Sequence, residues 1–165
     1  MADSSTPTPS GENSRTFLCV VDDSEELTQA LRFACRRAMS TDGKVALLYV
    51  VEPAEFQHFA AIGDLMREER REEAEEMLQV VASVVQRQTG RTPVIYIREG
   101  NVPEALVSLF DEGEEIDLLV LGAATGSEGP GPLVSHIVQK MAGRLPVPIT
   151  IVPGNLSDEE IDALT

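Results

Sequence analysis

Long apolar segments are absent from this chain. No run of about 18 apolar residues occurs, which is the length that a membrane-spanning helix needs. The first residues, MADSSTPTPSGENSR, also lack the apolar core of a secretory signal. These absences argue against membrane insertion and secretion, so we expect a cytoplasmic protein. With 165 residues, 42% of them hydrophobic, the chain is long and apolar enough for one globular domain.

Positive charge is scarce. The chain has 13 Lys and Arg against 28 Asp and Glu, which gives a formal net charge of -15 at pH 7. A field of this sign repels the phosphates of nucleic acids and of anionic lipids, so nucleic acid is not an expected partner. It does not exclude ATP, because backbone N–H groups can bind a phosphate locally within an acidic protein.

Residue patterns for catalysis and metal binding are also missing. Cys19 and Cys35 lie in apolar patterns typical of buried free thiols. His58 and His136 have no Cys or Ser partner at a diagnostic spacing, and these four side chains are scattered over different elements. Neither GxxxxGK followed by Ser or Thr, nor a GxGxxG after the first strand, is present. We therefore predict no catalytic residue, no metal ligand and no enzymatic activity.

Apolar runs alternate with segments of helical periodicity along the chain. Continuous apolar runs predict buried strands at 17–21, 45–51, 93–97, 117–122 and 148–152. Helical spacing of apolar residues predicts helices at 27–38, about 62–88, 102–110 and about 135–143, with Asn101 as the N-cap of the third. Parallel strands joined through helices need right-handed crossovers that cover the sheet. We therefore predict an α/β fold: a single doubly wound parallel sheet with helices on both faces.

The two ends of the chain differ from this pattern. Residues 1–14 are rich in Ser, Thr, Pro and Gly without an apolar period, which predicts a disordered N-terminal tail. Residues 155–165 form a C-terminal tail, in which Ser157 and Glu160 match a capping box and allow a short helix. Within the second helix, the mixed charges at 68–76 indicate a solvated face, and a docking surface is the alternative.

Three loops follow strands at the edge where α/β proteins bind ligands, the carboxyl end of the sheet. They are VVDDSE, YVVEP and GAATGSEGPGPLVSH. In the first, Asp22 suits a ribose or a phosphate-bound metal ion, and it equally suits a turn or cap of the following helix. In the third, glycines allow close approach of N–H groups to an anion at a helix N-terminus. Gly129 and Gly131, with their neighbouring prolines, equally suit a mobile linker.

Five segments together resemble the universal stress protein family. They are VVDDSEE, LLYVVEP, REGNVPEAL, DLLVLGAATG and PVPITIVP, and they cover about residues 15–154, which we take as the domain. The resemblance implies a five-stranded sheet of order 3-2-1-4-5. It also implies a homodimer commonly formed through the last strand, here Pro148 to Val152, whose exposed edge can pair with its twin. The family divides into members that bind ATP and members that do not.

The loop of the ATP-binding members reads GxxG, nine residues, then G followed by Ser or Thr. Aligned without a gap, Gly122 matches the first glycine, while the other positions hold Thr125, Ser135 and His136. Moving the second glycine to Gly126 rescues one position at the expense of an insertion. If a lost glycine needed a left-handed backbone, its replacement would cost roughly 1 to 2 kcal/mol, or about tenfold in affinity. The phosphate-facing half of the motif therefore departs from the family pattern.

The positions that would contact adenosine depart less from the family pattern. Asp22 and the backbone at Val50 match positions that resemble the family's adenosine contacts. Two hypotheses follow. The first is a dimeric stress-response regulatory or interaction protein with a degenerate nucleotide loop, no catalytic step and an unidentified protein partner. The alternative is a sensor that binds ATP with Mg²⁺, or another adenine nucleotide, in a variant loop. Slow ATP hydrolysis is a third and weaker hypothesis.

Overall fold

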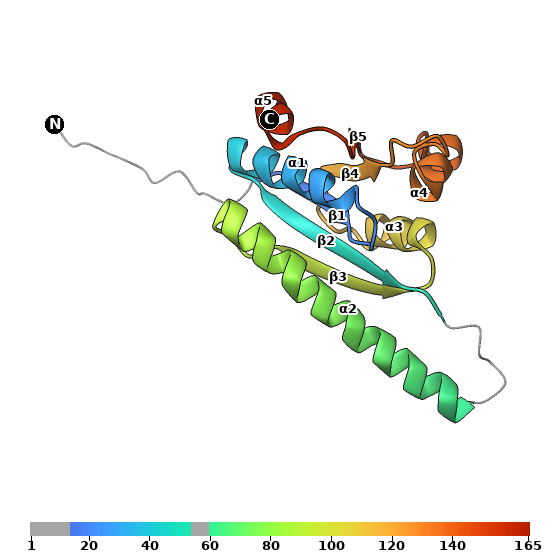
Figure 1. Cartoon of the computed structure of the whole chain (residues 1–165). Coiled ribbons are helices and arrows are strands. Elements are labelled where there is room, and N and C mark those ends of the chain that lie inside the picture. The colour runs from blue at the N-terminus through green and yellow to red at the C-terminus, as the bar shows by residue number, and fades with distance from the viewer. Residues whose placement is uncertain (1–13, 54–59) are drawn as a thin grey trace.

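A five-stranded parallel sheet forms the centre of the molecule (Figure 1). The computed structural model describes residues 14–53 and 60–165. The strands are β1 (Thr16–Val20), β2 (Lys44–Val51), β3 (Val94–Glu99), β4 (Leu118–Ala123) and β5 (Ile149–Pro153). Their order is β3-β2-β1-β4-β5, as the resemblance implied, and every neighbouring pair is parallel. The predicted fold class is therefore confirmed.

Helices cover both faces of the sheet. They are α1 (Leu27–Ser40), α2 (Ala60–Thr89), α3 (Val102–Asp111), α4 (Pro132–His136), which continues as the π-helical turn η1 (Ile137–Met141), and α5 (Asp158–Leu164). The fourth helix begins earlier than predicted because Gly131 turns the chain with φ of 102° and Pro132 presets the φ of the first turn. The start of this helix is set by the backbone geometry of the preceding loop, and the spacing of apolar residues carries no information about that geometry.

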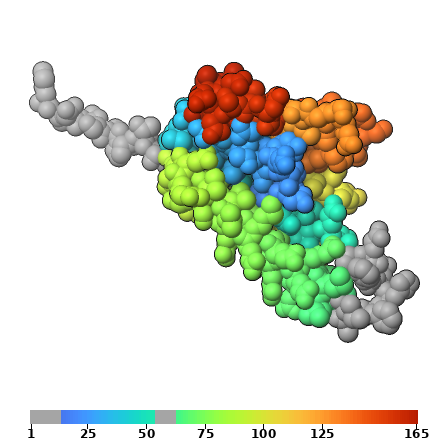
Figure 2. Space-filling view, in the orientation of Figure 1, coloured from blue at the N-terminus to red at the C-terminus, as the bar shows by residue number. Residues whose placement is uncertain are grey.

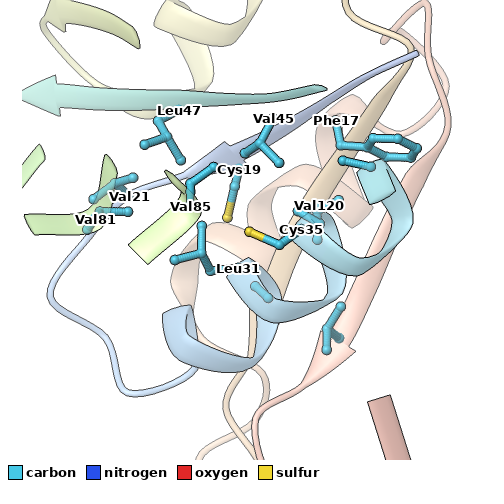
Figure 3. Packing of buried hydrophobic residues seen from close by; sticks show 14 of the residues in the cluster. Phe17, Cys19, Val21, Leu31, Cys35, Val45, Leu47, Val81, Val85 and Val120 are labelled. Carbon is cyan, nitrogen blue, oxygen red and sulfur yellow. The ribbon is translucent and has the colours of Figure 1, made fainter. Parts of the chain in front are cut away.

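Alternate residues of β1 enter two separate cores. Cys19 packs in the core under α1 and α2, with Leu31 and Val85 among its members (Figure 3). Leu18, its neighbour along the strand, packs in the opposite core with Leu106 of α3. Because both faces are covered, the strands read as continuous apolar runs and not as alternating apolar and polar residues.

The two cysteines lie in the first of these cores. Cys19 on β1 and Cys35 on α1 are free and buried, and their side chains point toward one another in Figure 3. Burial raises the pKa of the Cys19 thiol well above its usual range and that of the Cys35 thiol to about 12. Both thiols are therefore protonated at neutral pH, which agrees with the structural role predicted for them.

The C-terminal segment packs onto α1. In the space-filling view, the red atoms of α5 lie directly over the blue atoms of α1 (Figure 2). Ile161 is fully buried in the core under α1, and the Arg32 guanidinium of α1 donates to both carboxylate oxygens of Asp162, at 2.9 and 2.8 Å. The short helix that the sequence allowed is therefore present, and it belongs to the packed unit instead of forming a loose tail.

Local capping signals are observed where the sequence placed them. The Asn101 side chain accepts a hydrogen bond from the Glu104 backbone N–H at 2.9 Å and begins α3. Ser157 and Glu160 form the reciprocal capping box of α5. Apart from Ser14, the predicted N-terminal tail lies outside the described residues, as does His58.

Candidate functional site

A cavity of about 260 Å³ opens at the carboxyl ends of β1 and β4. These strands pair directly, so the loops that follow them meet at one edge of the sheet. The loop after β1 contributes Asp22 and Ser24 to the cavity wall, and the chain after β4 contributes Gly122 and the segment 130–134. The structure thus brings Asp22 and Gly122, two of the predicted site residues, to the same cavity.

Asp22 takes part in a local turn. Its Oδ1 accepts hydrogen bonds from the Ser24 backbone N–H at 3.0 Å and from the Ser24 hydroxyl at 2.5 Å. This is the arrangement of an Asx turn, which leads the chain from β1 into α1. One carboxylate oxygen is therefore committed to the turn, so the turn role considered for Asp22 is observed.

Gly122 is required for the packing of α1 against β4. A Cβ added there would lie 2.7 Å from both the Cβ and the backbone O of Glu26, the residue that precedes α1. Gly154, which directly follows β5, approaches the same residue, because a Cβ added to it would lie 2.8 Å from the Glu26 Cγ. The first glycine of the family loop pattern therefore has a packing reason here that does not involve a ligand.

The glycine-rich loop after β4 closes on itself. The Ala124 N–H donates to the Pro130 carbonyl at 3.1 Å, and the left-handed residues of the loop are Gly129 and Gly131, with φ of 92° and 102°. Neither Thr125 nor Ser135 has positive φ. The backbone penalty considered for the two lost glycines therefore does not arise, because the positions that need glycine lie elsewhere in the loop.

Thr125, Gly126, Ser135 and His136 do not converge on one point. Gly126 and Ser135 line an open depression of about 650 Å³ over the loop, and Thr125 is exposed. His136 lines a different groove, between α3 and η1. Successive helical residues point about 100° apart, so the two sides of α4 serve two different surfaces.

Val50, at the end of β2, borders a third depression, of about 460 Å³. Asp22 lines both this depression and the cavity that contains Gly122, so the two share this carboxylate. The remaining charged residues around Val50 are Asp23, Glu52, Arg70 and Glu73. The Arg70 guanidinium donates to the Glu52 carbonyl at 2.8 Å. The two residues matched to adenosine contacts, Asp22 and Val50, therefore border one depression.

A protein-family model matches residues 13–153, and it describes the universal stress protein family. The chain belongs to this family. Comparison of the sequence with curated proteins finds no significant match. Among the described residues, no helix combines the length and apolar character needed to cross a membrane.

Solved structures share the fold of this family member. The universal stress protein UspA from Lactobacillus plantarum is 20% identical with a TM-score of 0.68, and the alignment covers 86% of this chain and 99% of that one. A universal stress protein from Archaeoglobus fulgidus in complex with dAMP is 14% identical with a TM-score of 0.55, covering 85% and 98%. A universal stress protein in complex with cAMP is 21% identical with a TM-score of 0.51, covering 84% and 96%.

The cavity of this family member is acidic. Asp22, Asp23 and Glu26 line it, and none of the described residues in its wall is Lys, Arg or His. Glu26 occupies the N-cap position of α1 with its carbonyl accepting from the Ala30 N–H. A helix N-terminus favours negative charge, and here the chain itself supplies it. The carboxylates of the site would therefore repel an incoming phosphate, and none of the described lining residues provides a compensating cation.

Sequence reasoning missed Glu26 as part of this site and Gly154 as a residue that packs against it. Glu26 entered the sequence pattern only as the last letter of VVDDSEE, and its position one residue before the apolar helical period was the available signal. Gly154 gave no signal, because it meets Glu26 only after β5 has been placed beside β4. Both omissions concern contacts between segments far apart in the sequence.

Proposed function

We propose that this chain is a dimeric stress-response regulatory or interaction protein with a degenerate nucleotide loop and no catalytic step. It acts in the cytoplasm on an unidentified protein partner. The observation that carries the proposal is the acidic cavity, in which Glu26 packs against Gly122 and none of the described lining residues is a cation. A triphosphate placed there meets three carboxylates, including Asp22 and Asp23, at the end where its charge is greatest.

The absence of tight ATP binding is tested by calorimetric titration of the purified protein with ATP and Mg²⁺. Chromatography of the denatured supernatant first establishes whether nucleotide was carried through purification. We expect no bound nucleotide and no binding in the micromolar range. Copurified nucleotide, or a micromolar titration, would contradict the degenerate-loop proposal and favour a working variant loop.

The proposed homodimer uses β5, the edge strand next to β4. An edge strand offers unpaired N–H and C=O groups to a second copy, and Ile151 on this strand is 40% exposed. Light scattering should give a dimer for the wild type and a monomer for Ile151→Lys. Ile95→Lys is the matched control, because Ile95 is 42% exposed on β3, the opposite edge. Equal effects of the two substitutions, or a monomeric wild type, would reject this interface.

A second candidate function is an adenine-nucleotide sensor. It is supported by the depression that Val50 and Asp22 share, which lies beside the acidic cavity and has Arg70 in its wall. A ligand with one phosphate brings less charge toward Glu26 than ATP does, so this function predicts tighter binding of AMP than of ATP. Titration of AMP, ADP and ATP gives the order of affinities. Unchanged AMP affinity in both Asp22→Ala and Gly126→Val would remove this candidate.

A further inference from the structure

A groove of about 670 Å³ lies between α3 and η1. Both elements pack on the core opposite the one under α1 and α2. Its lining combines apolar and basic side chains: Val107, Met141 and Leu145 among the apolar ones, and His136, Lys140 and Arg144 among the basic ones. The three basic residues recur at every fourth position: His136 ends α4, Lys140 lies in η1, and Arg144 lies in the turn that follows η1. The groove therefore has an apolar floor beside a row of basic side chains.

The cations of this groove are unusual for the chain. From Glu99 to Thr165 the sequence contains no Lys or Arg other than Lys140 and Arg144. Neither forms a salt bridge within the described ranges, although the carboxylate of Glu104 lines the same groove. In a protein of net charge -15, unpaired cations gathered on one surface indicate an anionic partner from outside the chain.

The groove is open, which bears on the size of that partner. Lys140 and Arg144 are exposed, and Val107 is 45% exposed. Small-molecule sites usually bury about 70–90% of their ligand, and a shallow groove does not enclose one to that extent. An amphipathic helix needs no enclosure, because it buries its own apolar face in the groove and leaves its other face in water.

The overall charge also restricts the partner. Duplex DNA and anionic membranes present negative charge over wide surfaces, which the rest of this acidic chain repels. A short segment touches only the groove, where Lys140 and Arg144 outnumber the one lining carboxylate, Glu104. Carboxylates spaced one helical turn apart match cations spaced by four residues.

We propose that this groove binds a short acidic amphipathic helix of a partner protein. Apolar side chains of that helix pack on Val107 and Met141, and its carboxylates pair with Lys140 and Arg144. The proposal rests on the interaction function proposed above and supplies the chemistry of the partner. The groove shares no lining residue with the acidic cavity, so peptide binding and nucleotide binding are measured independently on the same protein.

The probe is a fluorescein-labelled synthetic helical peptide with leucines at i, i+3, i+4 and i+7 and glutamates on its flanks. We expect saturable binding to the full chain by fluorescence anisotropy, weakened by added NaCl because the charges are exposed. The double variant Lys140→Glu/Arg144→Glu should bind roughly tenfold more weakly or worse, since two attractions become repulsions. Its matched control is Arg15→Glu/Arg87→Glu, which reverses two exposed cations outside the groove and should change the affinity by less than about twofold.

Further variants separate the apolar contact from the charge contact. Val107→Asp, at a half-exposed position, should abolish peptide binding while the circular dichroism spectrum stays that of the wild type. A peptide with serine for leucine, or with lysine for glutamate, should not bind. The proposal is overturned if the wild type does not bind the acidic peptide, if the two double variants lose affinity equally, or if only phosphatidylglycerol vesicles bind. A titration with ATP on the same sample tests the proposed function separately.

Discussion

The cavity at the start of α1 and the groove between α3 and η1 draw on one stretch of chain, residues 122–145, yet their charges are opposite. Three carboxylates and no described cation line the cavity, whereas three basic side chains line the groove. Ser135 and His136 are neighbours in sequence but belong to different depressions. The stretch that resembles a phosphate-binding loop therefore places its basic residues away from the edge where a phosphate would bind.

The largest expected effect comes from adding a side chain to Gly122, the glycine at the cavity. Gly122→Ala places a Cβ 2.7 Å from the Glu26 backbone, which must shift. We expect the free energy of unfolding to fall by roughly 1 to 3 kcal/mol, measured by urea denaturation. Gly126→Ala is the control, because nothing lies within 4 Å of its Cβ and its φ is not positive; the change should stay within about 0.5 kcal/mol. Equal losses would show that Gly122 has no special packing role.

A smaller effect tests whether the negative charge of the cavity limits nucleotide binding. Glu26→Gln removes one of the cavity's negative charges without changing the size of the side chain. We expect the affinity for a fluorescent ATP analogue to rise by about threefold to tenfold, because one repulsion near the phosphates is lost. Glu159→Gln removes an exposed charge on α5 and should leave the affinity unchanged. If both variants behave alike, the acidic cavity does not limit nucleotide binding.

The smallest effect concerns the ion pair between Arg32 of α1 and Asp162 of α5. The hydrogen bonds from Arg32 hold the pKa of Asp162 below its ordinary value. A carboxylate with a lowered pKa in the folded state contributes stability above its unfolded pKa and loses it as pH falls through the folded pKa. Asp162→Asn should therefore be less stable than the wild type at pH 7, and the gap should narrow in acid below about pH 5. Denaturation curves at several pH values test this, and a gap that widens in acid would contradict it.

Much of the fold was predictable because it depends on local pattern. Both cores and all five strands followed from apolar runs, and the Asn101 cap and the capping box followed from short-range hydrogen bonding. The strand order came from the family resemblance. The early start of α4 was missed, because it depends on the left-handed backbone of Gly131 and not on periodicity.

The candidate site was predictable only in part. Asp22 and Val50 lie at the carboxyl edge, a location that follows from strand order, while their contact with a nucleotide stays a prediction. The approach of Glu26 to Gly122 was not predictable, because it depends on how closely α1 packs on β4. The assignment of His136 to the α3–η1 groove likewise needed the relative placement of two helices.

The sequence by itself determined the alternation of strands and helices, the acidic net charge and the departures from the family's ATP loop, because each is a property of residue order. The tertiary structure alone decided where the charges lie relative to one another. Strand pairing brought the loop with Asp22, Asp23 and Glu26 next to Gly122, and helix packing placed Lys140 and Arg144 beside Val107 of α3. Electrostatic interaction depends on distance in space, and folding sets those distances between residues far apart in the chain.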